Sequence, residues 1–338
     1  MKYDITTMGS ATIDMFVDTD IAESGHMICY PVGAKLTVKN MQFHIGGGGT
    51  NTAVSFARLG LNTAYLGKIG EHFKKDILNI LKKEKISFVG KVTDDMNDYS
   101  IILDTKEHNR TILTYKGANN KLMFKDIDTV NLKTKWFYFC SMMGDAFATQ
   151  IELSNFAKKN NIKIAFNPSY YQISKFRNEL YLILKNTTIL ILNKEEAIGL
   201  TQNINKKKDS KKLKSFYGKN SGKNMIDLIK KIHDAGPEIV CITDGKNTTF
   251  TSDGNTLYEF EPHKEIVALE RTGAGDAFAS SLVAAIAKDK PLEFALHLAT
   301  INSESVIQNY GAKNILLSWD KALKQMKKYP LKIRKSKI

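Results

Sequence analysis

The residues best suited to chemistry form one short segment, Gly273-Ala274-Gly275-Asp276. Gly273, Ala274 and Gly275 leave a turn almost without side chains, so consecutive backbone N–H groups can point at an anion. The small and apolar residues 277–287 that follow predict a buried helix, whose N-terminal dipole would strengthen that anion site. Asp276 is a poor ligand for phosphate, because like charges repel, but it is well suited to take a proton from an attacking hydroxyl group.

A simpler interpretation of the same segment is an ordinary glycine turn in which Asp276 caps a core helix. Short glycine-containing loops are weak signals. The segment therefore needs support from elsewhere in the chain.

A second glycine-rich segment provides that support. Four glycines at 46–49 precede Thr50 and Asn51 and open a predicted helix that ends at Gly60. Four successive glycines lose much entropy on folding, which favours a site where a ligand approaches the backbone closely. The amides of Gly47 and Gly48 and the side chain of Asn51 suit the hydroxyls of a polyol. The alternative is a flexible hinge.

Asp14 follows a predicted first strand and a turn of small residues. Groups just beyond the carboxyl end of a strand line the ligand crevice of an open parallel sheet, so Asp14 is a candidate substrate ligand. A turn or cap carboxylate is the alternative.

The second half of the chain alternates short apolar runs with segments that predict helices. The apolar runs are followed by polar turn residues, a pattern typical of a parallel sheet that is covered on both faces. These runs are residues 136–140, 162–166, 188–192 and 239–243.

Two of these strands lead into further candidate residues. Asn193 and Glu196 follow the third strand at the expected edge of the crevice, although a helix N-terminal cap explains both residues equally well. Thr243 and Gly245 stand at the end of the fourth strand.

Alternating polar and apolar residues at 35–44 and 98–116 predict a small accessory sheet with one wet face. Arg110 begins the returning strand of its hairpin, where it is placed to contact an anionic group or to remain in solvent. Residues beyond 321 are rich in lysine and predict a surface helix.

The chain has 338 residues and a net charge of +14. Its lysines are spread along predicted helices and are not interleaved with aromatic residues, so we expect neither a nucleic acid nor a membrane as partner. The start of the chain lacks an apolar signal run, which favours a cytoplasmic location. The polar, basic residues 206–223 are expected to form a surface insertion.

The glycine segment at 46–51 and the Gly-Ala-Gly-Asp segment at 273–276 together resemble the paired motifs of the ribokinase-like sugar kinases, the phosphofructokinase-B family. The resemblance extends along nearly the whole chain. It implies an α/β fold with a central, mainly parallel sheet and a small β-sheet lid. The large domain would comprise residues 1–14, 45–96 and 117–338, and the lid residues 15–44 and 97–116.

The resemblance also implies residue roles. Asp276 matches the catalytic base, and Gly273, Ala274 and Gly275 match the anion hole of the family. The remaining matches are substrate ligands at Asp14, Gly47, Gly48 and Asn51, a lid-return arginine at Arg110, nucleotide-side residues at Asn193, Glu196, Thr243 and Gly245, and Mg²⁺ held through water by Glu196.

ATP and Mg²⁺ are the cofactors that the resemblance implies. A monovalent cation such as K⁺ at Glu270 and Thr272 stays open, because this chain has Glu270-Arg271 where the family usually has Asp-Thr.

The expected activity is ATP-dependent phosphorylation of a sugar hydroxyl, and a homodimer through the lid is an open possibility. A nucleoside kinase of the adenosine type is the nearest alternative on the same fold. A catalytically silent ligand-binding protein is the alternative from another class. Intact Asp276 and Gly273 to Gly275 favour an enzyme.

Overall fold

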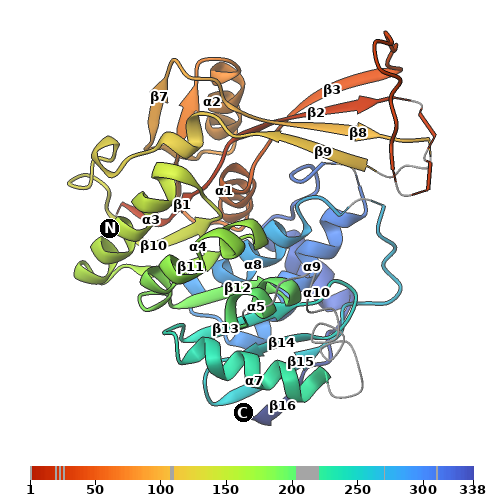
Figure 1. The fold of residues 1–338 in the computed structure, drawn as a ribbon. Helices are drawn as coiled ribbons and strands as arrows, with labels where there is room; N and C mark the ends of the chain where they lie inside the picture. Colours follow the sequence, from red (N-terminus) through yellow and green to blue (C-terminus); the bar gives the residue numbers. More distant parts are fainter. Residues whose placement is uncertain are drawn as a thin grey trace.

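The computed structural model describes residues 2–19, 21–22, 24–25, 27–106, 110–202, 221–269, 271–309 and 311–338, with only the backbone described at 221–223. The largest feature of this part of the chain is a ten-stranded sheet in the order β16-β15-β14-β13-β12-β11-β10-β1-β4-β6 (Figure 1). Its strands from β13 to β6 run parallel, and β14, β15 and β16 add antiparallel at one edge.

The strands of this sheet have the following bounds: β1 Tyr3–Met8, β4 Thr63–Leu66, β6 Ser87–Phe88, β10 Thr134–Cys140, β11 Lys163–Asn167, β12 Ile189–Asn193, β13 Ile239–Thr243, β14 Thr249–Ser252, β15 Thr256–Phe260 and β16 Arg334–Lys337. A separate pair consists of β5 Lys68–Gly70 and β7 Lys91–Thr93.

Helices cover both faces of the large sheet, as the apolar runs predict. Alternate side chains of β10 point to opposite faces, so Phe137 and Phe139 pack with α3, α4, α5 and α7, while Trp136 and Tyr138 pack with α1, α8, α9 and α10. The bounds are α1 Gly48–Arg58, α2 Lys74–Lys83, α3 Gly144–Lys159, α4 Tyr170–Leu184, α5 Lys194–Thr201, α7 Ser221–His233, α8 Ala274–Ala287, α9 Leu292–Ile307 and α10 Trp319–Lys328, with 3₁₀ turns at Ala118–Lys121 and Phe124–Asp126. Among the described residues, no helix combines the length and apolarity needed to cross a bilayer.

A four-stranded sheet, here called the small sheet, projects from one side of the molecule (Figure 1). Its order is β3-β2-β8-β9, with β2 Thr12–Asp18, β3 Asn40–Gly46, β8 Asp98–Asp104 and β9 Arg110–Tyr115. The predicted hairpin of β8 and β9 is confirmed. The expectation of a strand at 35–39 is wrong, because β3 begins at Asn40, opposite Asp18 at the end of β2. The N–H of Lys39 still donates to the Asp18 carbonyl at 2.9 Å.

Asp14 does not lie in a turn after the first strand, as the sequence suggested, but inside β2. The chain leaves β1 after Met8 and passes α1 closely, since a side chain at Gly9 would stand 2.7 Å from the backbone of Gly49. It then enters the small sheet, where Asp14 pairs with His44 and Ser100.

Glycine backbone contacts place α1 over the carboxyl edge of the large sheet. The carbonyl of Ser10 accepts hydrogen bonds from the N–H groups of Gly49 at 3.0 Å and Thr50 at 3.3 Å. The N-termini of α1 and α5 thus lie at the carboxyl ends of β1 and β12. This is the edge at which open α/β sheets bind ligands.

Candidate functional site

The turn before α8 has the geometry expected of an anion site. Gly273 caps the helix in the left-handed region at φ 81°, which strongly favours glycine. A side chain at Gly273 would also stand 2.4 Å from the Cβ of Ala312. A side chain at Gly275, by contrast, would meet nothing within 4 Å. Open space therefore lies beside Gly275 in the first turn of α8, where N–H groups lack acceptors within the helix. The N–H of Ala274 donates to the Arg271 carbonyl at 3.3 Å.

Helices α1 and α8 are joined by two polar contacts inside the protein. The Nδ2 of Asn51 donates to the Oδ2 of Asp276 at 2.8 Å, and the hydroxyl of Ser280 donates to that of Ser55 at 2.7 Å. Asn51 is only 5% exposed, yet its Oδ1 is buried without a hydrogen-bond partner among the described residues. A buried amide oxygen of this kind fits a ligand that donates a hydrogen bond, such as a hydroxyl group.

Asp276 lies where a proton acceptor would be effective. Burial raises the pKa of its carboxyl group, while the hydrogen bond from Asn51 and the charge of Lys313 oppose that rise. A side chain at Gly48 would stand 3.6 Å from the Oδ1 of Asp276. The backbone of Gly48 therefore lies close to the carboxylate.

Asp14 faces the same region from the small sheet. A side chain at Gly46 would meet its Oδ2 at 1.9 Å, so the carboxylate lies against the backbone of the glycine segment. Burial raises the pKa of Asp14 to about 6, against the charge of Lys313 and a hydrogen bond from Ser100. The structure thus gathers Asp14, Asn51 and Asp276 around the glycine segment, as the sequence predicted.

The Asn193 and Glu196 pair forms a capping box at the start of α5. The N–H of Glu196 donates to the Oδ1 of Asn193 at 2.9 Å, and the N–H of Asn193 donates to the Oε2 of Glu196 at 2.8 Å. The other oxygen of Glu196 accepts from the N–H of Tyr170 at 3.2 Å, so one carboxylate holds the starts of α4 and α5. Burial raises the pKa of Glu196 to about 7.

Thr243 lies beside Asn193 in the sheet register, and Gly245 follows at φ 58° with open space in front of it. The sequence reasoning missed the neighbouring ion pair between Lys194 Nζ and Asp244 Oδ2, at 2.9 Å. The sequence shows only a lysine directly after Asn193, and its burial, which is unusual for this residue type, is visible only in the structure.

Two other predicted residues lie apart from this cluster. Arg110 is exposed at the tip of the small sheet, on the same face as Asp14 but two strands across and four residues further along, about 16 Å away. Glu270 and residues 206–220 of the basic insertion lie outside the described residues. In the part of the chain that is described, no group of three or more His, Cys, Asp or Glu residues could hold a metal ion.

Lys313 is a site residue that the sequence reasoning missed. Its Nζ donates to the carbonyl of Ile45 and to the hydroxyl of Thr50, both at 2.7 Å. It borders a cavity of about 220 Å³ that Asp14, Gly46 and Thr272 also line. A lone lysine 37 positions after Asp276 gives no motif from which this placement could be read.

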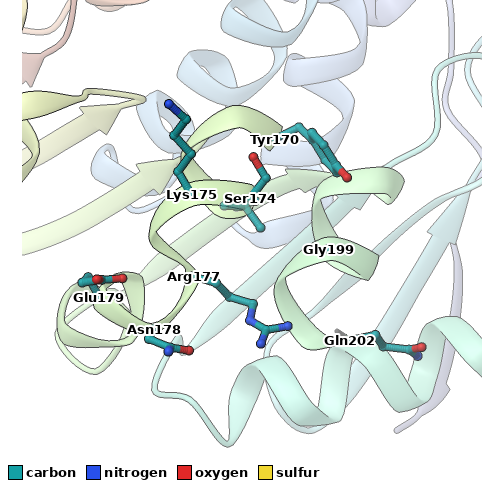
Figure 2. Close-up of a pocket in the computed structure, with 9 residues that line it drawn as sticks. Tyr170, Ser174, Lys175, Arg177, Asn178, Glu179, Gly199 and Gln202 are labelled. Atoms are coloured by element: carbon teal, nitrogen blue, oxygen red, sulfur yellow. The ribbon is translucent and has the colours of Figure 1, made fainter. Parts of the chain in front are cut away.

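A cavity of about 320 Å³ lies elsewhere, between α4 and α5, where α4 departs from helical geometry at Phe176. Figure 2 shows the side chain of Arg177 extending toward the α5 side of this cavity, whereas Lys175 points away. Its lining contains none of the predicted site residues. Cavity size alone therefore does not locate the candidate site.

Comparison with known proteins agrees with this geometry. Residues 4–319 match the pfkB family of carbohydrate kinases. The chain belongs to that family. The resemblance inferred from the two glycine motifs and the expectation of a kinase are both confirmed. The chain is thus a sugar or nucleoside kinase of the ribokinase family, whose members use ATP with Mg²⁺.

Individual relatives cover almost the whole chain. The kinase is 26% identical to the ribokinase of Haemophilus influenzae over 323 residues, 93% of this chain and 95% of that protein. It is similar in structure to the ribokinase of Arabidopsis thaliana complexed with ribose and ATP, with a TM-score of 0.76, 19% identity and coverage of 97% and 99% of the two chains. The nucleoside kinase of Burkholderia thailandensis in complex with inosine gives a TM-score of 0.72, 15% identity and coverage of 96% and 98%. These structures confirm the ribokinase-like α/β fold.

The buried Glu196 predicts a specific pH dependence of stability. Its pKa is raised from 4.5 to about 7, so the folded protein holds this proton more tightly than the unfolded chain does. The resulting stabilisation is fully present below about pH 4.5 and is lost as the pH rises through about 7. We expect the free energy of unfolding of the wild type, relative to Glu196→Gln, to fall by about 1–3 kcal/mol between pH 5 and pH 8.

Urea unfolding of both proteins across this pH range measures the difference. Glu152→Gln, at an exposed position of α3, is the control and should show a constant difference from wild type. A pH-independent difference for Glu196→Gln would contradict the raised pKa.

Proposed function

We propose that this protein phosphorylates a hydroxyl group of a sugar or sugar-like molecule by in-line transfer from ATP, with Asp276 as the base. The observation that carries the proposal is the partly buried Asn51–Asp276 hydrogen bond beside the N-terminus of α8. The pair combines a carboxylate held in a fixed orientation with an amide oxygen that lacks a donor. A sugar hydroxyl that lies between them has both an acceptor for its proton and a partner that orients it.

The other residues of the site have complementary roles in this proposal. Asp14 and the backbone of Gly47 and Gly48 bind further hydroxyls of the acceptor. Asp276 removes the proton of the attacking hydroxyl as the bond to phosphorus forms. The backbone amides of Gly273, Ala274 and Gly275 stabilise the charge on the transferred group. Lid closure would bring Arg110 toward the ligand.

ATP with Mg²⁺ supplies the phosphoryl group and neutralises part of its charge when bound. Open space in front of Gly275 and Gly245 fits the phosphates and the nucleotide side, respectively. Asn193 and Thr243 pair at the ends of β12 and β13, two residues before Gly245 in the case of Thr243. Both oxygens of Glu196 already accept backbone hydrogen bonds, so this carboxylate suits contact with the metal through water better than direct ligation. Thr272, with Glu270, is the proposed position for K⁺. The abundance of ATP and Mg²⁺ in the cytoplasm supports a cytoplasmic location for the protein.

A nucleoside acceptor is the alternative that one relative favours, since the Burkholderia thailandensis structure contains inosine. Turnover of nucleosides without turnover of any sugar in a broad panel would decide for it. A catalytically silent binding protein would release no ADP with either class.

Asp276→Asn tests the base directly. The variant keeps the shape and the hydrogen bond capacity of the side chain but removes its ability to take a proton. We expect kcat to fall by about 10²–10⁴-fold or more, with nucleotide affinity unchanged or tighter because a negative charge is lost. Coupled ADP-release assays and nucleotide titration measure both quantities.

Asp289→Asn provides the control, because this exposed carboxylate follows the other end of the same helix and should leave turnover unchanged. Near-normal turnover of Asp276→Asn in a preparation free of host kinases would show that Asp276 is not the base.

The small sheet is proposed to act as a lid over the acceptor. Asp14, His44 and Phe16 on one of its faces line the cavity that Lys313 borders, so closure along this face would exclude water. We expect amides at 40–46, 98–104 and 110–115 to exchange rapidly in the free protein and to gain protection when sugar and a non-hydrolysable ATP analogue are both bound. Hydrogen exchange with mass spectrometry measures this, and β10 and β11 serve as internal controls. Unchanged exchange in the small sheet would reject the lid.

The opposite face of the small sheet supports a homodimer. Strand register places Met41, Phe43, Leu113 and Tyr115 together on this face, and each is about half exposed. An apolar sheet face of this kind commonly marks an interface, and a second copy of the sheet matches it in shape and chemistry. Light scattering should give a dimer mass for the wild type and a monomer mass for Leu113→Glu. A monomeric wild type at micromolar concentration would refute the dimer.

A further inference from the structure

Lys313 lies in a turn that is packed directly against the anion site. The turn of residues 311–314 follows α9, and its Ala312 leaves no space for a side chain at Gly273, the cap of α8. A shift of this turn would therefore move the first residue of the anion site. Lys313 is the next residue along the chain.

The side chain of Lys313 reaches from this turn to the glycine segment. Its Nζ donates to the Ile45 carbonyl and the Thr50 hydroxyl, and the same hydroxyl donates to the Gly46 carbonyl at 2.6 Å. The contacted residues lie before and after Gly47 and Gly48 in the sequence. One ammonium group thus connects the acceptor side of the site with the turn behind the anion side.

Four charged groups from four different elements face Lys313. They are Asp14 on β2, Asp276 on α8, Glu84 after α2 and Arg58 on α1. Arg58 and Glu84 form a bidentate salt bridge, with N–O distances of 2.6 and 3.1 Å. Arg58 also donates to the Lys313 carbonyl at 2.8 Å. Because these two charges offset each other, the charge of Lys313 is the one that acts on both carboxylates among the described residues, while Lys116 acts in addition on Asp14.

We propose that Lys313 is a positioning residue for phosphoryl transfer: its ammonium group fixes the glycine segment against the turn behind Gly273 and holds Asp14 and Asp276 in their charged forms. This inference rests on the proposed function of the site. It adds a residue that acts through the carboxylates and the backbone, without contact with the reacting atoms.

The charge of Lys313 changes in the neutral pH range. Burial lowers its pKa to about 7, against the attraction of Asp14 and Asp276. Its positive charge is therefore present below about pH 7 and is lost above it. Asp14, with a pKa of about 6, is ionised more readily while that charge is present. The contribution of Lys313 should accordingly be largest in slightly acidic solution.

Lys313→Gln and Lys313→Met test the proposal through kcat/KM for the acceptor at subsaturating ATP, measured from pH 6 to pH 9. Gln keeps a hydrogen-bond donor without charge, and Met removes both. We expect kcat/KM to fall on the order of 10- to 100-fold near pH 6 for both variants, with the ratio of wild type to variant shrinking toward pH 9. The acid limb of the profile should also move to higher pH in both variants.

Lys83→Met is the matched control, because this exposed lysine of α2 borders the same cavity. Lys83→Met should leave the pH profile of kcat/KM unchanged. A ratio of wild type to Lys313→Gln that stays constant from pH 6 to pH 9 would mean a purely structural lysine and would overturn the proposal.

A second measurement does not depend on turnover. Carbon-detected NMR titration of the aspartate side chains should show higher pKa values for Asp14 and Asp276 in Lys313→Gln than in wild type. Unchanged values would overturn the proposal about Lys313. Absence of turnover in the wild type with every sugar and nucleoside would instead refute the proposed function, while the titration would still decide the role of Lys313.

Discussion

The site depends on the hydrogen bond between the Asn51 amide and the Asp276 carboxylate. A buried carboxylate is costly unless it is hydrogen-bonded, and a hydrogen bond to a charged group offsets about 1.5–3 kcal/mol of that cost. The bond forms only if α1 and α8 start side by side. Glycine makes this possible twice, since Gly49 lets α1 press against the end of β1, and Gly273 lets α8 begin in a left-handed turn. Glycine at these two positions thus allows the Asp276 carboxylate to lie within hydrogen-bond distance of Asn51.

A second constraint is that the polar residues of the site also hold the fold together. The two carboxylate oxygens of Glu196 accept backbone hydrogen bonds at the starts of α4 and α5. The hydroxyl of Thr50 accepts a hydrogen bond from Lys313 at the glycine segment. Such residues are poor candidates for free movement during turnover. Movement is better suited to the small sheet, which projects from the large one and whose outer strand β9 is exposed along its whole length.

Much of the fold followed from residue pattern. The apolar runs at 136–140 and 239–243 predicted parallel strands with helices on both faces. A strand that is covered on both faces has apolar side chains at successive positions, without alternating polar residues. The sequence also suggested a helix in the lysine-rich residues beyond 321, but only part of α10 lies there and Arg334–Lys337 form the edge strand β16. Strand pairing with β15 overrides the local pattern there, since it supplies partners for the backbone.

The candidate site was predictable where glycine and small residues form motifs, as at Asn51 and Asp276. It was not predictable for Lys313, because the approach of this side chain to Thr50 depends on packing between α9 and the anion turn. Asp14 illustrates an intermediate case. Its residue type suited a ligand, but its position inside β2 depends on the departure of the chain from the large sheet at Gly9.

The partners in the Asn51–Asp276 hydrogen bond are separated by 225 positions in the sequence. Contacts between such distant segments form late in folding, because a long loop must be closed before they stabilise the chain. A partly folded chain would therefore contain a glycine-rich loop and a carboxylate that do not yet meet. The arrangement of Asn51 beside Asp276 should accordingly be limited to the fully folded state.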